Sequence, residues 1–295
     1  MVFSQLSYKT QKKILIVSFL IIPLALLLTF GYLPLFNLFR YSFHRWNGYS
    51  KDMEFVGLKN YIRFFSEPEY FQVFKNSLYY FAGSFIQTSL ALFFAAILST
   101  KVKGRNFFKG VIFFPSLLNS VAIGFIFLYF FKPDGTFDTV LQAIGLEGII
   151  HYWIRNPRII NVSLAGTSVW RYLGGSFIIF LGAMQSIPPS FYEAAEIDGA
   201  NKWRQFKYIT FPSIKRIVEL MMILAVSGSI RVFETPRIMT RGGNGSMTFV
   251  LQTMETAFES QKYGLASAMG IILLIIVVLV TLLQKWLFAE REELA

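Results

Sequence analysis

The sequence predicts an all-α, polytopic membrane protein with six transmembrane helices. Of its 295 residues, 54% are hydrophobic and only 15% are charged. The mean hydropathy is +0.51, and the hydrophobic share exceeds the roughly 45–50% of ordinary soluble domains. The charged residues cluster between long uncharged runs. Several of these runs reach the roughly 20 residues that a helix needs to cross a bilayer.

The first expected span is the uncharged run from Ile14 to Phe39, which follows a short basic segment. It is longer than the roughly 7 to 15 apolar residues of a secretory signal, and no small-residue cleavage site follows it. We therefore expect a first span or membrane anchor. Pro23, Gly31 and Pro34 predict kinks within it.

Five more spans are expected along the chain. The third is interrupted by Pro115, Asn119 and Ser120, and a polar loop over residues 132–158 separates it from the fourth. The fifth is the weakest by hydropathy, because charged residues stand toward both of its ends. The expected ranges are 76–100, 110–131, 159–187, 217–240 and 263–284.

This pattern divides the chain into three segments. Residues 1–76 comprise an N-terminal tail, the first span and an external segment whose aromatic side chains suit the headgroup level of a bilayer. Residues 77–286 form the core, and residues 287–295 form a tail; the resemblance described below implies that this tail is cytoplasmic and that the interfacial segment is external. Lysine and arginine are shared almost evenly between the two sides, so their distribution does not decide the orientation.

Charge and rare residue types exclude several classes of function. The net charge of +11 is typical of nucleic-acid binding, but the cations lie in short links between apolar runs, so we expect no nucleic-acid partner. The chain has no cysteine, and His44 and His151 are far apart in sequence, so we expect no metal site and no cofactor. No phosphate-binding loop and no nucleophile signature is present. We expect no enzyme activity in this chain.

A polar and basic segment, residues 188–212, interrupts the hydrophobic pattern; we call it the polar segment. Ser190 and Glu193 have the spacing of a capping box, which predicts a short helix. Gly199 is placed to end that helix in a left-handed conformation, and Asn201 to cap the next turn. Pro212 is expected to follow once the second helix has ended. An exposed helix with small alanines and apolar bulk predicts a docking element for a soluble partner.

The polar segment resembles the EAA loop of ABC importer permeases, which have the MetI-like fold. Glu193-Ala194-Ala195, Asp198-Gly199-Ala200 and the later Phe206, Ile209 and Pro212 carry the resemblance. In that family the loop forms the coupling helices that sit in a cleft of the cytoplasmic ATPase. The alternative is a turn that only joins two spans. The resemblance implies that these residues couple the chain to the ATPase: Glu193, Ala194, Ala195, Asp198, Gly199, Ala200, Phe206 and Pro212.

Four other stretches are similar to the carbohydrate-uptake branch of these permeases. They are 55–61, 170–174, 185–188 and 263–268, and Thr240-Arg241-Gly242-Gly243 matches a turn after the fifth span. The resemblance implies a multi-pass permease in a bacterial or archaeal cell membrane, with both termini cytoplasmic. The implied partners are a second, similar permease, an ABC ATPase dimer, an extracytoplasmic solute-binding protein, a sugar substrate and the lipid bilayer.

Charged side chains at membrane depth are costly and usually face a cavity or a partner. Arg231 and Glu234 are three residues apart, so they are expected to pair on one helix face, and Arg171 is expected to face a cavity. Sugars need flat apolar faces and hydrogen-bonding groups. The expected substrate path comprises Asn119, Trp170, Arg171, Tyr172, Ser227, Ser229, Arg231, Phe233 and Glu234.

In maltose-type permeases the sugar is held on the fourth and fifth spans. The resemblance carries those positions to Arg171, Tyr172, Gly175, Ala225, Gly228, Ser229 and Val232. Several polar and aromatic groups of that type are missing here. We therefore expect that the substrate is not maltose, or that the companion subunit holds it.

Two alternatives stay open at this point. One is a stand-alone secondary transporter or channel that uses Arg171, Arg231 and Glu234 as an ion or proton relay. The other is an ABC importer of a solute other than a sugar, such as a peptide or a polyamine.

Overall fold

The structure is a computed structural model that describes residues 7–100 and 102–289. Within these residues the chain forms two compact units. One contains the chain up to Ser66 together with Thr253–Leu274, and the other contains Glu67–Gln252 and the chain from Ile275 onward. The two units are described separately below.

The first unit begins with a long helix that contains a π-helical turn. The side chain of Ser7 caps α1 by accepting a hydrogen bond from the backbone N–H of Thr10. Pro34 lies in the first turn of α2, directly after the π turn. A π turn leaves out the usual hydrogen bond, which suits a proline that has no N–H to donate. The π turn thus lies where Gly31 and Pro34 predicted a kink, while α1 continues through Pro23. The bounds are α1 Tyr8–Leu27, the π turn Leu28–Tyr32 and α2 Leu33–Ser42.

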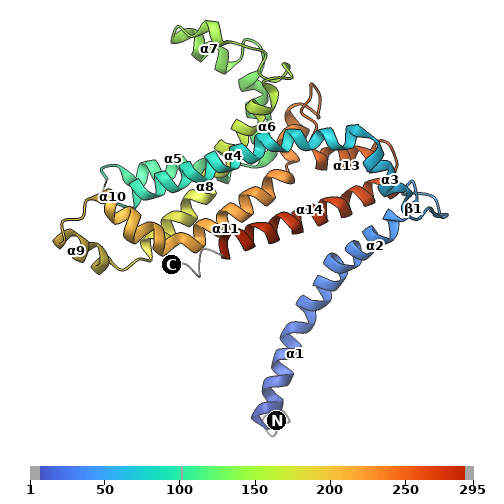
Figure 1. Cartoon of the computed structure of the whole chain (residues 1–295), viewed down its shortest axis with the longest axis horizontal. Coiled ribbons are helices and arrows are strands. Elements are labelled where there is room, and N and C mark those ends of the chain that lie inside the picture. Colours follow the sequence, from blue (N-terminus) through green and yellow to red (C-terminus); the bar gives the residue numbers. More distant parts are fainter. Residues whose placement is uncertain (1–6, 101, 290–295) are drawn as a thin grey trace. The chain divides into compact units, whose positions relative to one another are not determined.

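A short hairpin and one helix complete the N-terminal part of this unit (Figure 1). The two strands are antiparallel, with His44 opposite Phe55 and Arg45 opposite Glu54. The bounds are β1 His44–Arg45, β2 Glu54–Phe55 and α3 Lys59–Ser66. Helices α13 Phe249–Phe258 and α14 Tyr263–Ala289 each contribute residues to both units.

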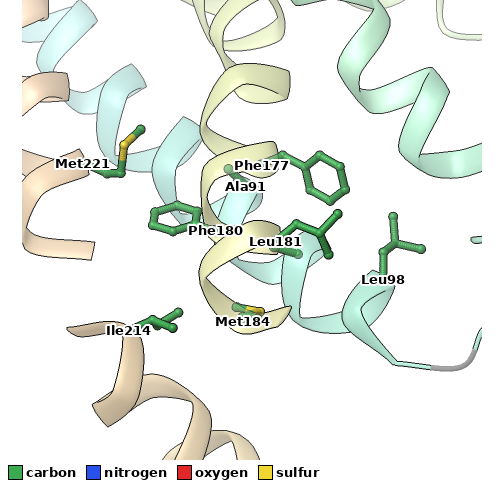
Figure 2. Close-up of a cluster of buried hydrophobic side chains, with 9 residues drawn as sticks. Ala91, Leu98, Phe177, Phe180, Leu181, Met184, Ile214 and Met221 are labelled. Atoms are coloured by element: carbon green, nitrogen blue, oxygen red, sulfur yellow. The ribbon is translucent and has the colours of Figure 1, made fainter. Parts of the chain in front are cut away.

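The second unit is built on three helices that pack around one apolar core, α4, α8 and α11 (Figure 2). Helix α5 also packs on α8, and Gly174 permits the approach, because a Cβ there would lie 2.5 Å from the carbonyl oxygen of Ile112. The core comprises Ala91, Ala95 and Leu98 of α4, Phe177, Phe180, Leu181 and Met184 of α8, and Ile214 and Met221 of α11. The bounds are α4 Pro68–Ser99, α5 Arg105–Leu117, α6 Ser120–Phe131, α7 Thr136–Ala143, a 3-10 turn Glu147–Ile149, α8 Ile160–Gln185, α9 Pro189–Ile197, α10 Lys202–Gln205, a π turn Phe206–Thr210, α11 Phe211–Ile230 and α12 Glu234–Met239.

Several expected spans differ from the helices observed. The third expected span is two helices, α5 and α6, which meet at an angle of 100° where Asn119 caps α6. The fifth breaks after Ile230, and α12 begins at Glu234. The expected polar loop over 132–158 contains α7, and α13 was missed, because neither short helix has a long apolar run.

The number of spans follows from length and charge. Four described helices are long and apolar enough to cross a bilayer, and the bent pair α5–α6 would make a fifth span. Helix α11 has 20 residues, but Lys215, Arg216 and Glu219 stand in its first half. The expected count of six spans therefore stays a prediction. The four are Tyr8–Ser42, Pro68–Ser99, Ile160–Gln185 and Tyr263–Leu287.

Candidate functional site

The polar segment folds as two short helices joined by a tight turn. Gly199 has φ +74°, and the backbone N–H of Ala200 donates to the carbonyl of Ala195 at 2.8 Å, as expected for a helix that ends in a left-handed residue. The Asn201 side chain accepts from the backbone N–H of Arg204 at 2.9 Å and so caps α10. The predicted turn and second cap are confirmed.

Two other local expectations for this segment are wrong. Pro188 is the N-cap residue of α9, so Ser190 lies inside the first turn and the capping box with Glu193 does not form among the described residues. A proline at the start of a helix needs no hydrogen bond there, and this removes the demand for a side-chain cap. Pro212 does not follow the end of a helix. It lies in the first turn of α11, after the π turn, so the helix continues past it.

Side-chain hydrogen bonds hold the two short helices together. The Tyr192 hydroxyl lies 3.0 Å from the Thr210 hydroxyl, and the buried Gln205 amide donates to the carbonyl of Ala200 at 3.2 Å. The Lys202 ammonium donates to the Glu196 carboxylate at 2.6 Å. This hydrogen bond is the main reason that the pKa of Glu196 lies below its ordinary value, and a second one from Gln205 adds to it.

The outer surface of the polar segment exposes large apolar side chains. Glu193, Ala194, Asp198 and Gly199 are also exposed. The exposed fractions are 58% for Phe191, 87% for Ile197, 69% for Trp203 and 67% for Tyr208. Large apolar side chains gathered on the exposed surface of an otherwise polar segment are typical of a surface that binds another protein.

A cavity of about 590 Å³ lies between α4, α8, α11 and the link that follows α11; we call it the central cavity. Of the expected substrate-path residues, five line it. They are Tyr172, Ser229, Arg231, Phe233 and Glu234. Of the positions carried over from maltose-type permeases, Gly175, Ala225, Gly228 and Val232 line it as well. The structure therefore brings residues of α8 and residues of α11 and its following link, which are distant in sequence, together at the central cavity.

The remaining substrate-path candidates lie outside the cavity lining. Asn119 is exposed and uses its side-chain oxygen to accept from the backbone N–H of Val121. The Trp170 ring packs edge-on against Phe127, with ring centroids 5.2 Å apart. Ser227 is buried, and its hydroxyl lies 3.4 Å from that of Thr281.

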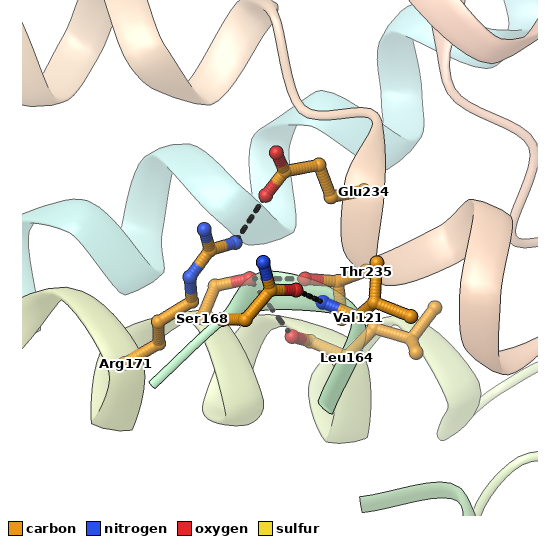
Figure 3. Close-up of polar contacts among 7 residues, drawn as sticks. Val121, Leu164, Ser168, Arg171, Glu234 and Thr235 are labelled. Atoms are coloured by element: carbon orange, nitrogen blue, oxygen red, sulfur yellow. Dashed lines mark hydrogen bonds and ion pairs between the residues drawn. The ribbon is translucent and has the colours of Figure 1, made fainter. Parts of the chain in front are cut away.

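The expected ion pair between Arg231 and Glu234 does not form among the described residues. Helix α11 ends at Ile230 and α12 begins at Glu234, so the two residues do not share a helix face. Glu234 pairs with Arg171 instead, and the Arg171 side chain reaches toward it from α8 (Figure 3). The Arg171 guanidinium also lies 4.8 Å from the centre of the Tyr172 ring, and the Arg231 Nε donates to the carbonyl of Ser227 at 3.1 Å.

This ion pair joins α8 to the start of α12 beside the central cavity. One helical turn away, the Ser168 and Thr235 hydroxyls lie 3.4 Å apart, so two polar contacts link the same elements (Figure 3). The Arg171 side chain is 17% exposed and that of Glu234 is 46% exposed. Because Glu234 is partly open, the pair can separate without leaving a fully buried charge.

Helix α4 supplies one wall of the cavity, which sequence reasoning missed. The Gln87 amide donates to the Ser176 hydroxyl at 2.7 Å, and Tyr80 and Ser84 line the same wall. The Tyr80 hydroxyl is buried and has no hydrogen-bond partner among the described residues. Tyr80, Ser84 and Gln87 are four and three apart, so they share one helix face, and this spacing was the available signal.

Small residues create the open space of the cavity. A Cβ added at Gly175 or Gly228 would have open space around it, as far as the described residues extend. The cavity is therefore lined by small residues of α8 and α11, by polar groups of α4 and by Glu234, which pairs with Arg171. A concave, mostly apolar surface with a few polar groups is the composition that small-molecule sites use. The described residues hold no group of three or more potential metal ligands.

Comparison with known proteins decides the family. The model of the family described as "Binding-protein-dependent transport system inner membrane component" matches residues 87–291. The chain belongs to this family. The matched range includes the whole polar segment and most residues of the central cavity.

Related proteins match over nearly their full length. "Probable ABC transporter permease protein YurN" of Bacillus subtilis (strain 168) is 33% identical over 289 residues, which cover 96% of this chain and 99% of YurN. "Multiple sugar-binding transport system permease protein MsmF" of Streptococcus mutans is 29% identical over 278 residues, 93% of this chain and 95% of MsmF.

A solved structure confirms the fold. A chain of a bacterial ABC transporter involved in the import of the acidic polysaccharide alginate superposes with a TM-score of 0.83 at 20% identity. The superposition covers 95% of this chain and 96% of the other. The predicted all-α, multi-pass permease fold is thus confirmed.

Proposed function

We propose that this chain is the transmembrane permease subunit of an ATP-driven ABC importer of a carbohydrate. The observation that carries the proposal is the family match over residues 87–291, which includes both the polar segment and most of the central cavity. Relatives such as MsmF are named for sugar transport. The family name itself implies a solute-binding protein as a partner.

The connection between polar segment and cavity supports a coupling role. The segment joins the end of α8 to the start of α11, and both of these helices line the cavity. At about 1.5 Å per residue, Gly175 lies roughly 15 Å along α8 from the segment, and Gly228 roughly 26 Å along α11. A force applied to the segment would therefore be transmitted along α8 and α11 to the residues that line the cavity.

The remaining partners follow from the same role. A separate ATPase dimer would dock on the exposed face of the polar segment, and a second permease would complete the solute path. In this arrangement the polar segment and both chain termini lie in the cytoplasm. Glu193, Ala194, Ala195, Asp198, Gly199, Ala200, Phe206 and Pro212 are the proposed coupling residues.

Two features weigh against a stand-alone transporter. Arg171 pairs with Glu234, while Arg231 donates to a backbone carbonyl, so the three side chains do not form a continuous relay among the described residues. The family depends on a binding protein, which suits an importer driven by a separate ATPase. Competition by sugars for the cognate binding protein would separate a carbohydrate from a peptide or polyamine substrate.

The test measures uptake and ATP hydrolysis in the same proteoliposomes, with the chain assembled with its partner subunits. Gly199→Val should reduce uptake at least tenfold while membrane insertion persists, because a β-branched residue in a left-handed conformation costs about 1–2 kcal/mol and distorts the turn. Gly199→Asn is the matched control, because asparagine tolerates this conformation.

A charge reversal provides a second, independent test of the coupling role. Glu193→Lys should also separate ATP hydrolysis from uptake, whereas Glu147→Lys, an equal change at an exposed residue outside the polar segment, should not. If Gly199→Val and Glu193→Lys both transport at the normal rate, the coupling role is wrong.

A further inference from the structure

One polar contact in the wall of the central cavity joins two helices that are distant in sequence. The Gln87 side-chain amide of α4 donates to the Ser176 hydroxyl of α8 at 2.7 Å and to the backbone carbonyl of Tyr172 at 3.3 Å. Gln87 and Ser176 are both buried, and both line the cavity. The two side chains are therefore held at fixed positions beside the open space.

These hydrogen bonds fix which way round the Gln87 amide lies. The carbonyl of Tyr172 can only accept, so the amide nitrogen must face it, and the side-chain oxygen Oε1 takes the opposite position. Among the described residues no group donates to Oε1. This oxygen is also not sealed inside the protein, unlike the Tyr80 hydroxyl on the same helix face, which is fully buried without a partner. Gln87 therefore presents an unused acceptor to the cavity.

The Ser176 hydroxyl supplies the matching donor. A serine hydroxyl can donate one hydrogen bond and accept two, and Ser176 accepts one from Gln87. On the same helix, Ser168 donates to the carbonyl of Leu164 at 3.2 Å, whereas Ser176 makes no such bond among the described residues. The proton of Ser176 is therefore available, and a donor and an acceptor lie next to each other in one wall.

An adjacent donor and acceptor select for a particular kind of ligand group. A hydroxyl both donates and accepts, so one sugar hydroxyl can satisfy Gln87 Oε1 and the Ser176 proton together. A carboxylate only accepts, and the ammonium group of a polyamine only donates, so each would leave one of the two groups unsatisfied. An unsatisfied buried polar group is costly. The pair therefore favours a polyhydroxyl solute over either charged class.

The space in front of the pair is open. Gly175 precedes Ser176 on α8, and a Cβ built there would meet nothing within 4 Å among the described residues. Gly228 of α11 lines the same cavity and is equally open. Ser84 stands three residues before Gln87 and is only partly buried, so the polar face of α4 continues along the cavity. These small residues leave room for a sugar ring whose hydroxyl reaches α4.

We propose that Gln87 and Ser176 bind one hydroxyl group of the transported sugar and thereby determine which sugars the permease accepts. The inference rests on the proposed carbohydrate function. It goes beyond the positions carried over from maltose-type permeases, because those lie on α8, on α11 and on the link that follows, whereas Gln87 lies on α4.

The test measures sugar binding to the chain assembled with its partner subunits, without the solute-binding protein, by saturation-transfer NMR. The probes are lactose, sucrose and maltotriose, and the one that binds most tightly is then replaced by its monodeoxy derivatives, each lacking one hydroxyl. The wild type should bind one derivative about tenfold more weakly than the parent sugar, because loss of that hydroxyl leaves Gln87 and Ser176 unpaired.

Gln87→Met keeps the length of the side chain but removes the amide. The parent sugar and that derivative should then bind within about twofold of each other, while discrimination at the other hydroxyls persists. Ser176→Ala should give the same loss, and it provides a second variant if Gln87→Met does not assemble. Thr88→Val is the matched control, because Thr88 is a buried polar residue beside Gln87 that lies outside the cavity lining. It should discriminate as the wild type does.

Four outcomes would overturn the inference. Equal weakening of the parent sugar and every derivative in Gln87→Met would reduce the contact to a structural link between α4 and α8. The same loss of discrimination in Thr88→Val would make it a general effect of altering α4. Undiminished discrimination in Gln87→Met and Ser176→Ala would place the hydroxyl site on the companion subunit, and the proposed permease function would stand. Failure of the wild type to bind any of the three probes would count against the carbohydrate function itself, and the inference would fall with it.

Discussion

The polar segment and the central cavity are stabilised in opposite ways. The polar segment keeps its shape through short-range hydrogen bonds, such as Asn201 to Arg204 and Lys202 to Glu196, and it exposes apolar rings. The cavity walls are held by apolar packing between helices far apart in sequence, with Phe177 and Phe180 fully buried. The exposed apolar side chains of the polar segment should therefore tolerate truncation without loss of stability, whereas the buried side chains behind the cavity should not.

The largest expected effect is a loss of stability when the apolar core behind the cavity is disrupted. Phe180→Ala should lower the free energy of unfolding by roughly 3 kcal/mol, because the buried ring leaves a void among α4, α8 and α11. Phe191→Ala, at an exposed ring of α9, should leave stability within about 0.5 kcal/mol of the wild type. Thermal melting followed by size-exclusion chromatography measures both. Equal destabilisation by the two variants would contradict the contrast.

The second prediction fills the central cavity without disturbing its walls. Gly175→Leu should lose most uptake while keeping near-normal melting behaviour, because the new side chain enters open space. Gly166→Leu is the matched control, since Gly166 is on the same helix and is also open, but does not line the cavity. Uptake that survives Gly175→Leu, or that fails equally in Gly166→Leu, would place the solute path elsewhere.

A smaller effect is expected from the ion pair beside the cavity. Arg171→Glu should impair uptake, because it sets two carboxylates against each other, and adding Glu234→Arg should restore much of the loss. Since Glu234 is partly exposed, the coupling free energy from a double-mutant cycle should be only about 1 kcal/mol. Independent, additive losses would show that the pairing has no role.

The smallest effect concerns pH at the polar segment. The pKa of Glu196 is lowered in the folded chain, mainly by the hydrogen bond from Lys202. The stabilisation is therefore present above the ordinary carboxyl pKa and is lost as the pH falls through the lowered value. Hydrogen exchange of the turn at residues 198–201, corrected for intrinsic rates, should rise in that acidic window. Lys202→Ala should remove this dependence, and an unchanged profile in that variant would assign it to another group.

The same contrast explains what could be predicted from the sequence. The turn at Gly199 and the cap at Asn201 rest on neighbouring residues, so their local pattern was sufficient. The capping box at Ser190 failed because proline at the helix start replaced the need for it. The apolar runs predicted α1, α4, α8 and α14 as long helices for the same local reason.

The cavity depended on tertiary structure that no local pattern contains. Glu234 was expected to pair with Arg231, its neighbour in sequence, but the break after α11 turns it toward Arg171 on α8. The Gln87 wall was missed because a polar residue in an apolar span has no evident partner until α8 is packed beside it. Six of the seven positions that the resemblance carried over line the cavity, and five of the nine residues expected for the substrate path do so.

The most direct test of the account asks whether a partner covers the polar segment. The chain contains no cysteine, so single cysteines can be introduced without background. In assembled membranes, a short cross-linker at Asp198→Cys should capture the ATPase subunit, while Glu147→Cys, also exposed but outside the segment, should not. Efficient capture that changes with bound nucleotide is the predicted result. Absence of capture at Asp198, or labelling of that cysteine from outside intact cells, would contradict the account.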